Sequence, residues 1–165
     1  MPTSKKDIFA QTAIQLREQG FIIKTQDETR QWGGFFVIAE EQAPQFADTY
    51  FDGLAVDELR IAGQLSPKIL LVAPHQPLSW QYHHRRAEIW RVVQGPVGVV
   101  TSPMDEEGEL KTYVPGEQLA LRQGERHRLV GLQDWGLLAE IWQHTDAAHP
   151  SDENDIVRVQ DDYGR

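Results

Sequence analysis

The sequence contains no cysteine. This absence excludes disulfide bonds, thiolate metal sites and cysteine nucleophiles. No apolar run approaches the roughly 20 residues needed to span a bilayer. Residues 1–9, MPTSKKDIF, lack the apolar stretch and the cleavage site of a secretory signal. We therefore expect a cytoplasmic protein with no membrane partner.

Positive charge is also scarce, because 16 Lys and Arg residues face 25 Asp and Glu residues and give a formal net charge of −9. This balance argues against nucleic acid as the principal partner. Much of the acid lies in residues 105–109 and 151–162, whereas several arginines gather elsewhere: Arg85, Arg86, Arg91, Arg122, Arg126 and Arg128. A locally basic site in an acidic protein favours a small anionic ligand. The alternative is that these arginines only balance surface acids.

The length of 165 residues fits one compact domain. Residues 4–19 are expected to form a helix, because Ser4 and Asp7 resemble a capping box and Gly20 would end it. A second helix is expected over residues 43–54. From Lys68 onward, short apolar segments alternate with turn residues, which is typical of a β-sandwich or barrel. The expected strands cover residues 68–73, 79–83, 88–94, 97–101, 110–113, 118–121, 127–131 and 137–143.

The sequence thus predicts an all-β barrel over residues 68–165, with its C-terminal tail included. Residues 1–67 are expected to form a helical extension that packs on this barrel within one structural domain. No repeat or linker divides the chain.

Residues 78–90, LSWQYHHRRAEIW, place an unusual number of polar groups between apolar neighbours. Gln81 and His83 are two positions apart, so on a strand their side chains share one face. Glu88 has the wrong parity for the same uninterrupted strand, so residues 84–87 must contain a turn or bulge. A further ligand must come from elsewhere, and His127 is the best candidate.

These four side chains supply two imidazoles, one carboxylate and one carboxamide oxygen. Such a set suits one divalent metal ion, with zinc first and manganese, cobalt, nickel or iron as alternatives. The competing interpretation is that Gln81 and His83 only line a polar face of a sheet.

Two segments resemble the metal motifs of the cupin superfamily. QYHHRRAEIWRVVQG resembles the first motif, with Gly95 seven residues after Glu88, and YVPGEQLALRQGERHRL resembles the second, with Gly124 before His127. The run LSWQYHHRRAEIW and the tail DIVRVQDDYGR are most similar to the cupin domain of type II phosphomannose isomerases. The resemblance implies a cupin barrel, which is a double-stranded β-helix or jelly roll. It also implies the metal ligands Gln81, His83, Glu88 and His127.

The resemblance further implies a metal-dependent aldose–ketose isomerase acting on a phosphorylated sugar, of the mannose-6-phosphate to fructose-6-phosphate type. A divalent ion would polarise the sugar oxygens and stabilise the enediolate. Arginine forks suit phosphate oxygens, and the candidates for substrate binding are Arg85, Arg86, Arg158 and Arg165. Arg86 and Arg165 are also the candidate catalytic residues. A homodimer is expected by analogy with other cupins.

Two other functions stay open at this point. One is a non-catalytic cupin that binds a sugar or sugar phosphate as a sensor or accessory module. The other is a different cupin enzyme, such as an oxygenase, although Gln81 in place of a histidine disfavours a dioxygenase. The remaining histidines, His75, His84, His144 and His149, are expected to be exposed.

Overall fold

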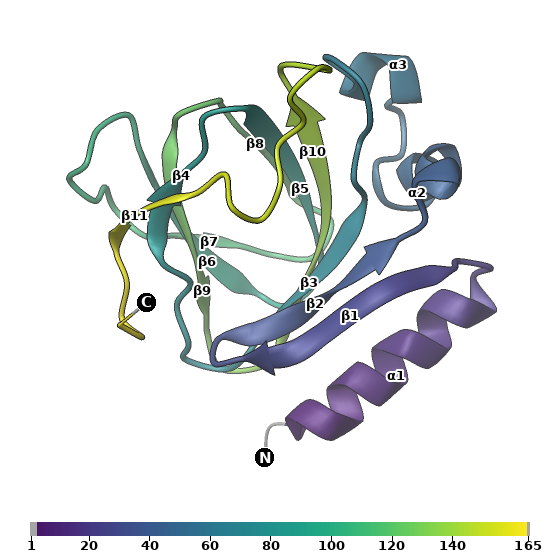
Figure 1. The fold of residues 1–165 in the computed structure, drawn as a ribbon. Coiled ribbons are helices and arrows are strands. Elements are labelled where there is room, and N and C mark those ends of the chain that lie inside the picture. The colour runs from purple at the N-terminus through teal and green to yellow at the C-terminus, as the bar shows by residue number, and fades with distance from the viewer. Residues whose placement is uncertain (1–2, 165) are drawn as a thin grey trace.

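The computed structural model describes residues 3–164, which form two antiparallel sheets that enclose a barrel, with helices against one sheet (Figure 1). The first sheet contains, in spatial order, β1 (Ile23–Arg30), β2 (Gly33–Ile38), β3 (Lys68–Val72), β10 (Gly136–His144), β5 (Arg86–Gln94) and β8 (Gln118–Leu121). The second contains β11 (Val157–Gln160), β4 (Trp80–Tyr82), β9 (Arg126–Gly131), β6 (Val97–Ser102) and β7 (Lys111–Tyr113). The prediction of a mainly β barrel is confirmed.

The helices lie in the first third of the chain. Helix α1 (Lys5–Glu18) is capped by the Ser4 hydroxyl, which accepts a hydrogen bond from the backbone N–H of Asp7 at 3.2 Å. A 3₁₀ turn, η1 (Glu40–Gln42), leads into α2 (Ala43–Tyr50), and α3 (Val56–Leu59) follows. The expected helix over residues 43–54 is therefore shorter than predicted. Across residues 3–164, no helix combines the length and the apolar character needed to cross a membrane.

The N-terminal segment is not only helical, because it also contributes β1 and β2 to the first sheet. Strand β2 pairs with β3, so this hairpin extends the sheet of the barrel (Figure 1). Strand β1 was missed in the sequence because IKTQDETR is mostly exposed and shows no apolar alternation. The turn between the two strands needs glycine: a Cβ on Gly33 would lie 2.0 Å from the carbonyl oxygen of Leu71.

The eight strands expected beyond residue 67 are all present, each with ends within two residues of the prediction. Strand β11 was not predicted. It pairs antiparallel with β4, which brings the C-terminal tail back to the barrel.

Strand parity divides the apolar side chains into two clusters. Alternate residues of β3 and β10 face the helices and form the outer cluster with α1 and α2, among them Phe9, Phe46, Ile69, Leu71 and Ile141. The intervening residues face the barrel interior, among them Leu70, Val72, Trp90, Val92 and Leu138. Lys68, Glu88 and Glu140 have the same parity as this inner set and are buried. Charged side chains therefore occupy one part of an otherwise apolar barrel interior.

Candidate metal centre and its cavity

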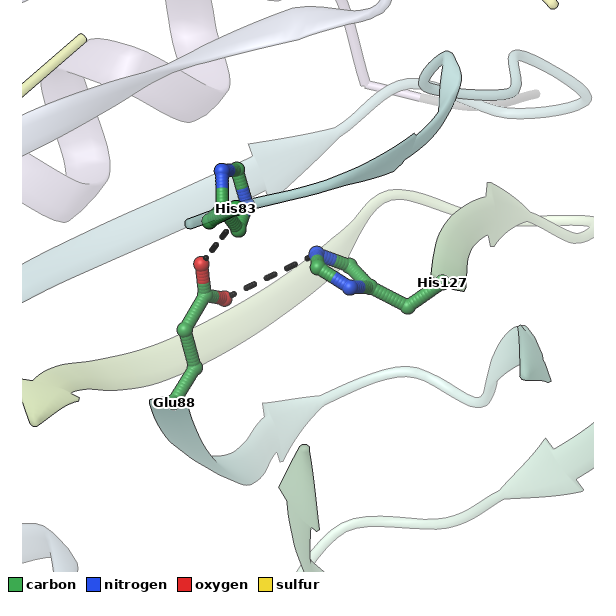
Figure 2. Close-up of side chains that lie close together, drawn as sticks. All are labelled: His83, Glu88 and His127. Atoms are coloured by element: carbon green, nitrogen blue, oxygen red, sulfur yellow. Dashed lines mark ion pairs between the residues drawn. The ribbon is translucent and has the colours of Figure 1, made fainter. Parts of the chain in front are cut away.

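His83, Glu88 and His127 converge inside the barrel, with the carboxylate of Glu88 between the two imidazoles (Figure 2). Their candidate ligand atoms all lie within 4.8 Å of one another, and all three side chains are buried. Glu88 Oε1 is 3.1 Å from Nε2 of His83, and Oε2 is 4.0 Å from Nε2 of His127. The three residues come from different places: the end of β4, strand β5 and strand β9.

The expected irregularity between His83 and Glu88 is present. Strand β4 ends at Tyr82, β5 begins at Arg86, and residues 83–85 form a bend between them. Asp155 holds this bend, because its two carboxylate oxygens each accept a backbone N–H at 3.0 Å, from His84 and Arg85 respectively. The bend changes the parity of the chain, so Glu88 faces the same interior as His83.

Backbone carbonyls fix the orientation of both imidazoles. Nδ1 of His83 lies 2.7 Å from the carbonyl oxygen of Asp155, and Nδ1 of His127 lies 3.1 Å from that of Glu125. A carbonyl oxygen can only accept a hydrogen bond, so Nδ1 carries a hydrogen in each ring, and Nε2 is the atom directed toward Glu88. Such outer contacts are typical of metal-bound histidines.

The electrostatics favour a neutral His127 beside an ionised Glu88. Burial lowers the pKa of His127 to about 4, even though the charge of Glu88 acts in the opposite direction. Burial opposes the ionisation of Glu88, but the Arg86 guanidinium and the contact with His83 outweigh it and hold the pKa of Glu88 well below its usual value. A neutral His127 and an ionised Glu88 are the protonation states that a metal ion requires of these two ligands.

One buried atom lacks a partner that a metal ion would supply. Nε2 of His127 is a buried polar atom that makes no hydrogen bond within residues 3–164. Such an atom is costly unless it has a partner. The residues present therefore fit a divalent ion, and the nitrogen and oxygen donors leave zinc and several other first-row metals as candidates.

Gln81 lies beside this triad. On β4, its Cα is paired with that of His127 on β9 and with that of Arg158 on β11. Its side chain lines the same cavity, and its Oε1 atom accepts a hydrogen bond from the hydroxyl of Ser79. The proposed role of Gln81 as a fourth ligand stays a prediction.

Arg86 is buried next to the triad, and its guanidinium makes several hydrogen bonds. Its guanidinium donates to Glu88 Oε1 at 2.9 Å, to the Ser151 hydroxyl at 2.7 Å and to Nε2 of His83 at 3.1 Å. It also lies 3.6 Å from the ring centroid of Trp142. Arg86 is thus placed to hold the ligands and to add positive charge to the site.

The other predicted substrate arginines have different surroundings. Arg158 lines the cavity that His83 and Glu88 also line. Arg85 is not among the described residues that line it; its Nε donates to the carbonyl of His149, and its guanidinium lies near Asp152 and Asp155. Arg165 lies outside the described residues.

Two cavity residues were missed in the sequence, Lys68 and Glu140. Glu140 accepts hydrogen bonds from the indole N–H groups of Trp90 and Trp142, both at 2.8 Å. Burial and the neighbouring Glu88 charge raise the pKa of Glu140 to about 8. The available signal was a single acid within the otherwise apolar strand GLLAEIW, because an unpartnered charge at such a position is costly.

The remaining histidines partly follow the sequence prediction. His75, His84 and His149 are exposed, as expected. The expectation was wrong for His144, which is buried because β10 extends to it. Its Nδ1 atom accepts the backbone N–H of Ser151 at 2.9 Å.

Together the two sheets and the buried triad define a cupin barrel with a candidate metal centre. Residues 39–161 match the family described as "Mannose-6-phosphate isomerase C-terminal". The chain belongs to this family, as its two motifs indicated.

Individual proteins resemble the chain over parts of its length. It is 31% identical over 110 residues, 66% of the chain, to a protein described as "Mannose-1-phosphate guanylyltransferase" from Salmonella montevideo. It is 31% identical over 111 residues, 67% of the chain, to "Xanthan biosynthesis protein XanB" from Xanthomonas campestris. These matches cover only 21% and 22% of the two relatives, so the chain spans about a fifth of their length.

A solved structure shares the fold. KdgF from Halomonas sp. superposes with a TM-score of 0.52 at 15% identity, over 79% of this chain and 91% of that one.

Proposed function

We propose that the chain is a metal-dependent sugar-phosphate isomerase that interconverts mannose 6-phosphate and fructose 6-phosphate. The observation that carries this proposal is the buried triad of His83, Glu88 and His127. Two of its members, His83 and Glu88, line a cavity that several cationic side chains also line. The family match over residues 39–161 and the names of the two relatives support sugar-phosphate or sugar-nucleotide metabolism as the setting.

The reaction needs three things from the site. It must hold the hydroxyl and carbonyl oxygens of the sugar, stabilise the enediolate, and move a proton between neighbouring carbons. A divalent ion supplies charge at the sugar oxygens when it is bound. His83, Glu88 and His127 would hold this ion, and Gln81 would complete the set as a fourth ligand.

Arg86 has a supporting role in this scheme. Its guanidinium stays protonated near neutral pH, so it does not remove a proton from the substrate. Its contacts with Glu88 and His83 keep these side chains in place, and its charge favours the enediolate.

Proton transfer requires a different group, and the cavity offers Glu140. This carboxyl lines the cavity and belongs neither to the metal triad nor to the barrel surface. We therefore assign the proton transfer to Glu140. Arg165 stays a candidate from the sequence resemblance.

A turnover assay tests the proposal. The metal-loaded protein should convert mannose 6-phosphate into fructose 6-phosphate, and a chelator should abolish the activity until metal is restored. Tight binding of the sugar phosphate without turnover would instead favour the second candidate, a sensor or accessory module. Oxygen uptake by an iron-loaded sample would favour an oxygenase.

A further inference from the structure

Lys68 and Glu153 form an ion pair beside the candidate metal centre, and the two side chains differ in their exposure to solvent. The Nζ atom of Lys68 contacts the Glu153 carboxylate. The Lys68 side chain is 7% exposed, whereas that of Glu153 is 55% exposed. Glu153 belongs to the segment between β10 and β11, and Lys68 is the first residue of β3. The glutamate can therefore turn to solvent at little cost, but the buried lysine cannot remain without an anion.

Aromatic rings keep the lysine in position. Its Nζ atom lies 3.7 Å from the ring centroid of Trp142 and 5.0 Å from that of Phe35. The guanidinium of Arg86 lies 3.6 Å from the same Trp142 ring. Lys68 thus contacts the same indole ring as Arg86, the arginine that contacts Glu88 and His83.

The Lys68–Glu153 pair also borders two cavities. Lys68, Trp142 and Glu153 line both the cavity that His83 and Glu88 line and a second cavity, which is also lined by Lys24, Glu40 and Ser66. The first has a volume of about 90 Å³ and the second about 330 Å³. Ordinary ligand pockets measure roughly 300–1,000 Å³, so a sugar phosphate needs more room than the first cavity provides. Glu153 is the most exposed of the three side chains that border both cavities, so it is the one that can move aside for a larger ligand.

The charges of the side chains that line the first cavity also favour an anionic ligand. Its lining includes four cationic side chains, Arg30, Lys68, Arg86 and Arg158, and three acidic side chains, Glu88, Glu140 and Glu153. Arg86 is matched by Glu88, and Arg30 pairs with Asp27 at 3.0 Å. If Glu153 leaves and a divalent ion binds, the cavity gains positive charge that suits a doubly charged anion.

We propose that Lys68 binds the anionic group of the substrate, and that Glu153 occupies this position in the free protein until the substrate displaces it. The identification of that group as a phosphate monoester rests on the proposed function. Lys68 is then a residue for substrate recognition, and Glu153 competes with the substrate for the same cation.

The experiment measures binding of mannitol 6-phosphate and of mannitol to the metal-loaded protein by calorimetry. Mannitol 6-phosphate has no carbonyl group and cannot be isomerised, so binding is measured without turnover. The variants are Lys68→Met and Glu153→Gln. The controls are Lys111→Met and Glu106→Gln, which remove the same charges at exposed positions outside the cavity.

Lys68→Met should weaken binding of mannitol 6-phosphate about tenfold or more, with no more than a twofold change for mannitol. Glu153→Gln should tighten binding of the phosphate about two- to fivefold, because the competing charge is gone. Both controls should match the wild type. Unchanged phosphate binding in Lys68→Met, or weaker phosphate binding in Glu153→Gln, overturns the proposal.

Two further outcomes separate this proposal from the proposed function. If Lys68→Met does not fold, the half-exposed Glu153→Gln decides the question alone. If the wild type binds mannitol 6-phosphate through Lys68 but does not isomerise mannose 6-phosphate, the recognition site stands and the isomerase assignment fails. If isomerisation occurs and neither variant changes phosphate binding, the isomerase assignment stands and the proposed role of Lys68 in recognition fails.

Discussion

The carbonyl oxygen of Asp155 lies 2.7 Å from Nδ1 of His83, so the segment that precedes β11 directly orients a candidate metal ligand. The carboxylate of the same residue holds the bend after His83, and it accepts a hydrogen bond from the Ser151 hydroxyl at 2.6 Å. The segment that precedes β11 therefore helps to build the candidate metal centre.

Replacing Asp155 should disturb both stability and metal binding. Asp155→Ala leaves two backbone N–H groups and a buried hydroxyl without their acceptor, which should cost about 2–4 kcal/mol of unfolding free energy. Metal affinity should fall roughly 10–100-fold, because the bend that carries His83 loses the carboxylate that holds it, although the backbone carbonyl of residue 155 remains. Denaturant unfolding and a metal titration measure the two effects. Asp134→Ala, at an exposed turn, is the matched control and should change neither.

The metal-free protein should lose stability in acid through His127. The pKa of His127 is about 4 in the folded protein and about 6.5 in the unfolded chain. Because the unfolded state binds more protons between these values, stability falls as the pH drops from about 6.5 to 4 and this contribution then levels off. The group contributes up to about 3 kcal/mol above pH 6.5.

His127→Gln isolates this contribution. Urea unfolding of the metal-free variant at several pH values should show a shallower dependence between pH 4 and 6.5 than the wild type. His84→Gln, at an exposed position, should keep the wild-type slope. Equal slopes for all three proteins would contradict a buried, neutral His127.

Glu140 offers a test of the proton-transfer assignment. Glu140→Gln should lower kcat about 10²–10⁴-fold, the range for loss of a general acid–base group, while the metal content stays at the wild-type level. Turnover and metal analysis on the same preparation separate these effects. A variant with normal kcat would remove Glu140 from the reaction, and one without metal would make it a structural support for Glu88.

The candidate ligand positions could be predicted because the alternation of side chains along a strand can be followed in the sequence. Gln81 and His83 follow one alternation, Glu88 follows another, and the sequence between them is too polar to continue a buried strand. His127 was found from its position after the Gln123-Gly124 turn. The structure brings His83, Glu88 and His127 together as this reasoning expected.

Lys68 and Glu140 could not be found in the same way. Each is a single charged residue in a strand that is buried on both faces, so no alternation marks the inward side. Their position depends on which face packs against α1 and α2, a long-range contact that local sequence does not reveal. The pairing of β11 with β4 is also a long-range contact, and a strand of four residues is too short to show a clear alternation of apolar and polar residues.

The metal content of the purified protein tests the central claim most directly. After loading and removal of excess metal, elemental analysis should find close to one divalent ion per chain in the wild type and in His84→Ala. His127→Ala and Glu88→Gln should retain almost none, although circular dichroism should show that they keep the barrel. A wild type that holds no metal after loading, or a His127→Ala variant that retains a full equivalent, would contradict the claim that this triad is a metal centre.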